Sequence, residues 1–217
     1  MVKARLKELT VEEFANTITH GVGLLLSLCG LVVLVALAVV FGDFWYVLSS
    51  IVYGLSLVVL YGASTLYHSA TSPEEKRILQ IVDHCCIYLL IAGSYTPFTL
   101  IVLRSGIGIG LFAFVWAFAI FGILGKVFLA KRFKSASVVS YLIMGWIGVI
   151  AVEPLFAKLG FPAIALIVLG GLAYSIGVIF YAWTRLRHHH AIWHLFVMSG
   201  SFLHFLAIAL YVIPFGL

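Results

Sequence analysis

The feature that most constrains this chain is a series of long stretches without a charged residue. Seven stretches of at least 18 residues contain no Asp, Glu, Lys or Arg: 14–42, 44–73, 84–103, 105–125, 135–152, 159–184 and 188–217. A membrane-spanning helix needs about 20 apolar residues. A membrane β-barrel would instead show alternating segments of about 10 residues. The sequence therefore predicts an all-α fold, a bundle of seven transmembrane helices.

The composition excludes two other classes of protein. Of the 217 residues, 64% are hydrophobic and 10% are charged, whereas an ordinary soluble domain has about 25% charged residues. A water-soluble fold of this size cannot bury that much apolar surface. A disordered chain is excluded by the same values, because disorder requires low hydrophobicity and high charge.

The cations are unevenly shared between the two ends of the predicted helices. With the N-terminus inside, only Arg104 and Lys158 lie outside. The inside segments hold Lys3, Arg5, Lys7, Lys76, Arg77, Lys126, Lys131, Arg132, Lys134, Arg185 and Arg187. Because Lys and Arg accumulate on the cytoplasmic side, we expect the N-terminus inside and the C-terminus outside, in the inner (plasma) membrane. This bias explains the net charge of +5, so no nucleic-acid partner is expected.

The whole chain, residues 1–217, is expected to form one integral membrane domain. Residues 1–18 are expected to form a short cytoplasmic amphipathic arm. Thr10 and Glu13 in this segment match a helix capping box. The expected spans are 19–41, 45–68, 78–103, 107–129, 136–153, 161–184 and 189–213.

Polar residues at the inner ends of three spans form a candidate metal site. Ser64 and His68 are four residues apart on the second span, and His190 and His194 are four apart on the seventh, so each pair shares a helix face. Two histidines one turn apart can hold a metal ion from a single helix. Three imidazoles with one water are typical of catalytic zinc. Asp83, the only acid or base placed clearly within a span, falls in the same cytoplasmic leaflet.

Other interpretations of these residues stay open. A histidine at the membrane edge can be an ordinary interfacial residue, and Asp83 can be a structural carboxylate. Asn16 and His20 can either line the same cavity or anchor the first helix. His84 is expected to be structural. His204 lies about 15 Å beyond the histidine pair along the helix, and is expected to be a buried hydrogen-bonding residue.

Four stretches carry a family resemblance: EFANTITHG at 13–21, STLYH at 64–68, DHCCIYLLIAGSYTP at 83–97 and HAIWHLFVMSGSFLHF at 190–205. In this order the chain resembles the bacterial hemolysin III family, within the progestin and adipoQ receptor group that includes the adiponectin receptors. The resemblance extends from the first span to the last. It implies a seven-helix bundle with the N-terminus inside, and a zinc ion held by His68, His190 and His194. It also implies that Asp83 and Ser64 lie beside that metal.

The same pattern is similar to that of the alkaline ceramidases, which are intramembrane amide hydrolases. We therefore expect a zinc-dependent hydrolase of lipid amide or ester bonds, involved in membrane lipid homeostasis, with an acyl chain in the bundle cavity. Asp83 would orient the attacking water and take its proton. Ser64 would donate a hydrogen bond to this water or help to stabilise the oxyanion. The alternative is a non-enzymatic sensor or receptor with structural zinc. A cytolysin, as the family name suggests, is disfavoured, because a secreted pore-former must first be soluble and this chain is too apolar.

Overall fold

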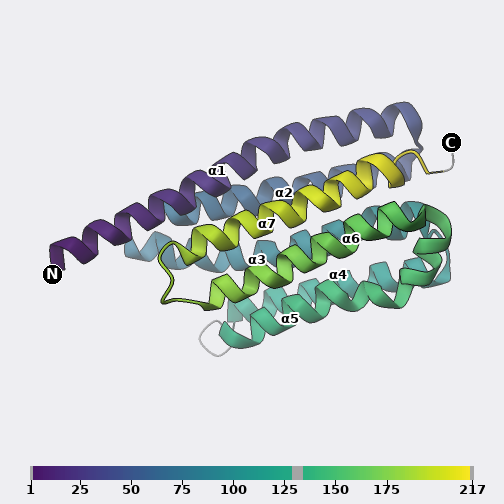
Figure 1. Cartoon of the computed structure of the whole chain (residues 1–217). Coiled ribbons are helices and arrows are strands. Elements are labelled where there is room, and N and C mark those ends of the chain that lie inside the picture. The colour runs from purple at the N-terminus through teal and green to yellow at the C-terminus, as the bar shows by residue number, and fades with distance from the viewer. Residues whose placement is uncertain (1, 129–133, 216–217) are drawn as a thin grey trace.

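The computed structural model describes residues 2–128 and 134–215, without the side chains of 2–10 and 134–136. Every regular element in this part of the chain is helical, as predicted (Figure 1). The α-helices are α1 (Val2–Phe41), α2 (Phe44–Ser69), α3 (Pro73–Pro97), α4 (Gly106–Phe128), α5 (Lys134–Trp146), α6 (Val152–Ala182) and α7 (His189–Ala207). Short π-helical turns, Phe98–Val102 and Ile208–Val212, follow α3 and α7, and a 3₁₀ turn, Ile147–Ala151, joins α5 to α6.

Six helical stretches are long and apolar enough to cross a membrane, whereas the sequence predicted seven. The difference arises because nearly all of the expected spans 136–153 and 161–184 lies in one continuous helical stretch, Ser137–Ala182, of 46 residues. A straight helix of that length would measure about 69 Å, more than twice the hydrocarbon thickness of about 30 Å.

This long stretch is not straight. Gly160 has φ +76° and ψ 177°, which is non-helical, and glycine adopts a positive φ without the penalty of a Cβ. Figure 1 shows the chain running along α5, turning, and returning along α6. The N- and C-terminal ends of the chain lie at opposite ends of the bundle in the same view.

Helix α1 is longer than the first expected span. It begins at Val2, so the segment expected as a separate arm continues into the same helix, and Figure 1 shows its first turns projecting beyond the other helices. The capping box predicted at Thr10 and Glu13 is therefore wrong, because no helix begins at Thr10. The carboxylate of Glu13 has other partners, described below.

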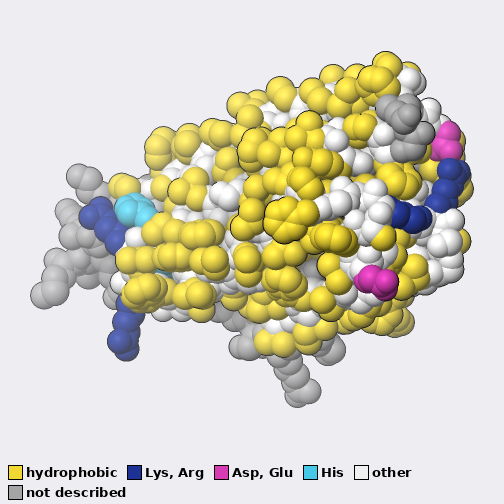
Figure 2. Space-filling view, turned by 45° about the vertical axis from the view of Figure 1, so that its right-hand side comes forward, with side chains coloured by type: hydrophobic (Ala, Val, Ile, Leu, Met, Phe, Trp, Pro, Cys, Tyr) yellow, Lys and Arg dark blue, Asp and Glu magenta, His cyan; other side chains and the backbone are white. Residues whose placement is uncertain are grey.

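The surface is that of a helical membrane bundle. Figure 2 shows hydrophobic side chains over the middle of the molecule and charged side chains toward its two ends. Large apolar side chains point outward, among them Val40 (71% exposed), Phe121 (72%) and Phe128 (76%). Of the cations that suggested the orientation, Lys3, Arg5, Lys7, Lys131, Arg132 and Lys134 have side chains outside the described part of the chain.

Helix α6 packs closely against α7, the helix that carries the candidate ligands His190 and His194. A Cβ added to Gly177 would lie 2.7 Å from the ring of Trp193, and one added to Gly200 would lie 2.8 Å from the ring of Tyr174. Small residues let membrane helices approach closely. The histidines at the start of α7 are thereby held at a defined distance from the bundle core.

Candidate metal centre

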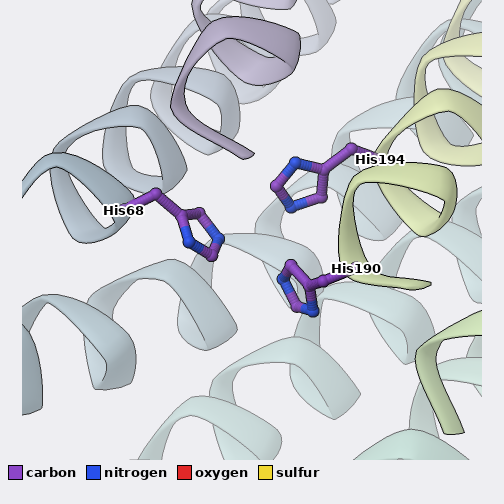
Figure 3. Close-up of side chains that lie close together, drawn as sticks. All are labelled: His68, His190 and His194. Atoms are coloured by element: carbon purple, nitrogen blue, oxygen red, sulfur yellow. The ribbon is translucent and has the colours of Figure 1, made fainter. Parts of the chain in front are cut away.

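The side chains of three histidines from two helices point toward one another (Figure 3). His68 lies in the last turn of α2, and His190 and His194 lie in the first turns of α7. Each offers one ring nitrogen, and these three atoms lie within 4.8 Å of one another. His68 and His194 are 4% and 1% exposed, and His190 is half-buried. The structure therefore brings together the three residues that the sequence singled out as metal ligands.

The ends of the helices explain this convergence. Helix α2 ends at Ser69, where Ala70 becomes extended. Helix α7 begins after His188, whose φ of +56° is left-handed, an uncommon conformation for a residue other than glycine. The backbone N–H of His188 donates a hydrogen bond to Glu12 Oε1 at 3.1 Å. Helix α1 thus also holds the start of α7 in place.

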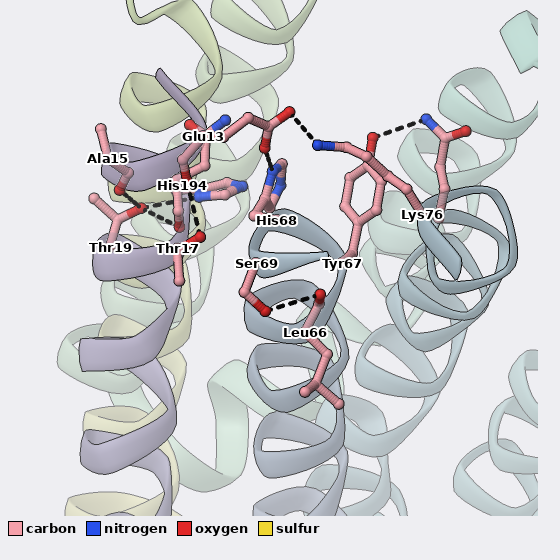
Figure 4. Close-up of polar contacts among 12 residues, drawn as sticks. Glu13, Ala15, Thr17, Thr19, Leu66, Tyr67, His68, Ser69, Lys76 and His194 are labelled. Carbon is pink, nitrogen blue, oxygen red and sulfur yellow. Dashed lines mark hydrogen bonds and ion pairs between the residues drawn. The ribbon is translucent and has the colours of Figure 1, made fainter. Parts of the chain in front are cut away.

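Glu13 fixes which ring nitrogen of His68 donates a hydrogen bond. Its Oε2 lies 2.7 Å from His68 Nδ1, and its Oε1 accepts a hydrogen bond from Lys76 Nζ at 2.6 Å (Figure 4). A carboxylate can only accept hydrogen bonds, so Nδ1 is the donor. A neutral His68 ring in this contact has its lone pair on Nε2, which is buried and has no hydrogen-bond partner among the described residues. A carboxylate behind a histidine in this way is typical of metal sites.

Thr19 contacts Nδ1 of His194 as Glu13 contacts Nδ1 of His68. Its hydroxyl lies 3.0 Å from His194 Nδ1 and donates its single hydrogen to backbone oxygens of the preceding turn, Ala15 and Asn16, both at 2.9 Å. With that hydrogen on a backbone oxygen, the hydroxyl accepts a hydrogen bond from Nδ1–H. This leaves the lone pair on His194 Nε2. Two of the three imidazoles are thus held in the tautomer that presents Nε2.

The donor set fits a metal ion. It offers three imidazole nitrogens, an orphaned buried Nε2 and a carboxylate behind one ligand. Imidazole suits zinc, and also copper, iron and nickel. The histidines thus form a candidate transition-metal centre.

Asp83 and Ser64 lie next to the histidines on the wall of one cavity. Asp83 is 9% exposed and Ser64 is 1% exposed, and the Ser64 hydroxyl is a side-chain hydrogen-bond partner of the Asp83 carboxylate. Both residues line the cavity together with His190 and His194. The pair is therefore placed where a carboxylate and a hydroxyl can act on a molecule held beside the histidines.

The cavity has a volume of about 540 Å³ and is mostly apolar. It is lined along α3 and the following π-turn from Asp83 to Leu103, a helical distance of about 30 Å. Apolar side chains from other helices, such as Leu111, Val149 and Leu155, complete its walls. The cavity is thus long and mostly apolar, with polar side chains among those that line it.

The structure also places the histidines whose roles were open. His20 is 4% exposed, lines the cavity and stacks on His194, with 3.4 Å between ring centroids. His84 Nδ1 bonds the backbone oxygen of Gln80 within its own helix. His204 Nε2 bonds the backbone oxygen of Ile167 at 3.1 Å, the kind of role expected for it. Asn16 is buried one turn before His20, at 5% exposure.

Sequence reasoning missed three polar residues. Glu13 was assigned to a helix cap, and Thr19 was given no role. Lys126, counted only among the inside cations, lies in the last turn of α4 and is 6% exposed, with Nζ 3.5 Å from Ser137 Oγ. One sequence feature could have drawn attention to Glu13: its carboxylate directly precedes the uncharged stretch that begins at residue 14.

Comparisons with known proteins agree on one family. The family profile described as "Haemolysin-III related" matches residues 9–205, which include all four of the quoted stretches. The chain is 47% identical over 202 residues to "Hemolysin-3 homolog" of Bacillus subtilis (strain 168), covering 93% of this chain and 95% of that protein. It is 45% identical over 210 residues to "Hemolysin-3" of Bacillus cereus, covering 97% and 96%. It is 29% identical over 216 residues to the human "Monocyte to macrophage differentiation factor", covering 96% and 87%.

Proposed function

Because this chain belongs to the haemolysin-III-related family and is a multi-pass membrane protein, we propose that it is a zinc-dependent hydrolase of lipid amide or ester bonds. We place it in the inner (plasma) membrane, with a role in membrane lipid homeostasis. One observation carries the proposal: three histidines converge, and two of them, His190 and His194, line a mostly apolar cavity together with Asp83 and Ser64.

The proposal includes seven crossings, with the N-terminus inside and the C-terminus outside. It is supported by the reversal between α5 and α6, by the non-helical Gly160, and by the positions of the chain ends at opposite ends of the bundle. An odd number of crossings requires that the two chain ends lie on opposite sides of the membrane. The excess of Lys and Arg on the proposed inner side gives the direction.

His68, His190 and His194 would hold the zinc ion through one ring nitrogen each. Bound zinc supplies a Lewis acid and lowers the pKa of a water molecule toward 7. Glu13 and Thr19 keep two of the rings in the required tautomer. Three histidine ligands, with a fourth position left for water or substrate, are typical of catalytic zinc sites.

Asp83 would carry the proton in this mechanism. Its carboxylate would accept a proton from the attacking water as the water oxygen bonds to the carbonyl carbon of the lipid. It would return the proton to the leaving nitrogen or oxygen as the bond from the carbonyl carbon to that atom breaks. The Ser64 hydroxyl donates a hydrogen bond to the carboxylate and holds it in place. The apolar walls bind the acyl chain and keep bulk water from the rest of the cavity.

The test is a metal analysis followed by a lipid screen. Purified wild type, washed with chelator and reloaded, is expected to hold about one zinc per chain by elemental mass spectrometry, and His194→Ala much less. Wild type is then incubated with a panel of ceramides, N-acyl amides and acyl esters, with Asp83→Asn as the inactive control. We expect loss of hydrolysis with retained zinc in that variant.

Other results would replace this proposal. Zinc without hydrolysis across the panel, and an Asp83→Asn variant that keeps its cellular function, would favour a sensor with structural zinc. Release of contents from liposomes carrying few copies of the pure protein would favour the lytic activity that the names of the Bacillus relatives suggest. No metal in the wild type would remove the basis of the proposal.

A further inference from the structure

His20 is a buried histidine whose hydrogen-bonding capacity is unused. It lies on α1 at 4% exposure, and neither Nδ1 nor Nε2 has a hydrogen-bond partner among the described residues. A neutral imidazole always carries one N–H donor and one acceptor nitrogen. Buried polar groups are almost always paired, because an unpaired one costs free energy comparable with a lost hydrogen bond. A partner for the ring is therefore expected at this position.

Two neighbouring rings determine the orientation of His20. The ring stacks on His194 with a centroid distance of 3.4 Å and an interplanar angle of 15°, and it meets Tyr61 edge-to-face at 5.0 Å and 87°. Its two nitrogens lie on the rim of the ring, outside the stacked face. His20 lines the same cavity as Asp83 and Ser64, and this cavity is otherwise mostly apolar.

His20 is not one of the three candidate metal ligands. In the described part of the chain, the group of ligand atoms that all lie within 4.8 Å of one another comes from His68, His190 and His194. Asn16, one turn earlier on the same face of α1, also has a buried Oδ1 without a partner in the described chain. This face of α1 therefore provides unused polar groups beside the metal centre.

We infer that His20 binds the carbonyl oxygen of an acyl lipid in the cavity through a hydrogen bond from its ring N–H. A carbonyl oxygen accepts such a bond, and it is the polar group that an acyl chain places at the head of an apolar cavity. The inference rests on the proposed function in taking the cavity ligand to be an acyl lipid. It adds a ligand-binding residue on α1, apart from the metal ligands, Asp83 and Ser64.

The experiment uses two ligands that differ only at the carbonyl: methyl oleate, and oleyl methyl ether, in which CH₂ replaces C=O. Dissociation constants are measured by native mass spectrometry on the full chain after metal removal, so that neither coordination nor hydrolysis contributes. Wild type is expected to bind the ester about tenfold more tightly than the ether, the value of one good hydrogen bond.

Two variants separate hydrogen bonding from stacking. His20→Phe keeps an aromatic ring but no nitrogen, and is expected to bind both ligands equally. His20→Asn loses the ring but keeps an N–H donor, and is expected to retain at least a threefold preference for the ester. Tyr61→Phe, a matched control that removes only the hydroxyl bonded to Ser201, should keep the full preference.

The inference is overturned if wild type shows no preference, or if His20→Phe keeps it. It is also overturned if His20→Asn loses it, and that variant decides the question should the bulkier phenylalanine prevent folding. Zinc content is measured on every reloaded protein and is expected to be unchanged. A wild type without zinc would refute the proposed hydrolase, while the ligand preference of the metal-free protein would still decide the role of His20.

Discussion

Replacing Glu13 with Gln tests whether α1 tunes the metal centre. The carboxylate accepts the Nδ1–H of His68 at 2.7 Å, and the imidazole is almost fully buried, with a side-chain exposure of 3%. Gln keeps the size of the side chain but removes the negative charge that makes the ligand more basic. Partners behind a metal ligand typically contribute 10- to 100-fold in metal affinity, which corresponds to about 1.4–2.8 kcal/mol.

The ion pair between Glu13 and Lys76 should contribute much less. The two side chains are 34% and 30% exposed, and ion pairs near the surface are worth about 0–1 kcal/mol. Lys76→Gln is therefore the matched control, because it removes the ion pair and leaves the contact between Glu13 and His68. We expect that variant to change zinc affinity by less than about fivefold.

The assay is competition for zinc between the purified protein in detergent and chelators of graded affinity, with metal content read by elemental mass spectrometry. The reasoning predicts a clear loss for Glu13→Gln and nearly wild-type affinity for Lys76→Gln. Wild-type affinity in Glu13→Gln would refute the role assigned to the carboxylate. Equal losses in both variants would show that the charge pair, rather than the bond to His68, is what matters.

Three further predictions concern other parts of the chain. Thr19→Val, which removes the acceptor of the second oriented imidazole, should lower zinc affinity about tenfold in the same competition assay; unchanged affinity would contradict the tautomer argument. Gly177→Val should lower the thermal unfolding temperature by crowding α7, at a cost of about 1–3 kcal/mol; Gly106→Ala, where an added Cβ meets nothing within 4 Å, is the neutral control. At the opposite end of the bundle, the hydrogen bond from Arg104 lowers the pKa of the exposed Asp43 carboxyl, so the pair stabilises the fold above the unfolded pKa of Asp43 and this contribution is lost as pH falls through the lowered value. The small stability difference between wild type and Arg104→Gln should therefore vanish on acidification, and a difference that persists at low pH would exclude this linkage.

The helices and the cluster of three histidines were largely predictable from the sequence. Each uncharged stretch is long enough to form a membrane helix, because the bilayer imposes the same length on every span. The pair His190 and His194 follows from helical periodicity alone, since residues four apart share a face. Asp83 was conspicuous because charge is costly within a span. These rules act on neighbouring residues or on a single helix, so the linear sequence suffices for them.

The residues on α1 could not be assigned in that way. Local rules gave Glu13 a helix cap, and its partner His68 lies 55 residues away, while Thr19 meets His194 across 175 residues. The turn within Ser137–Ala182 depends on the positive φ of Gly160. From the sequence, Gly160 was expected only as the last residue of the link between two spans.

The sequence by itself thus determined which segments are helical, which faces carry histidines and which residues are candidate ligands. Only the tertiary structure decided that α1 closes over the site, which nitrogens are left for a metal, and that His20 lies unpartnered on the cavity wall among the described residues. The physical reason is that helical periodicity and hydropathy act within one segment. Hydrogen bonds between side chains on different helices form only after the helices have packed.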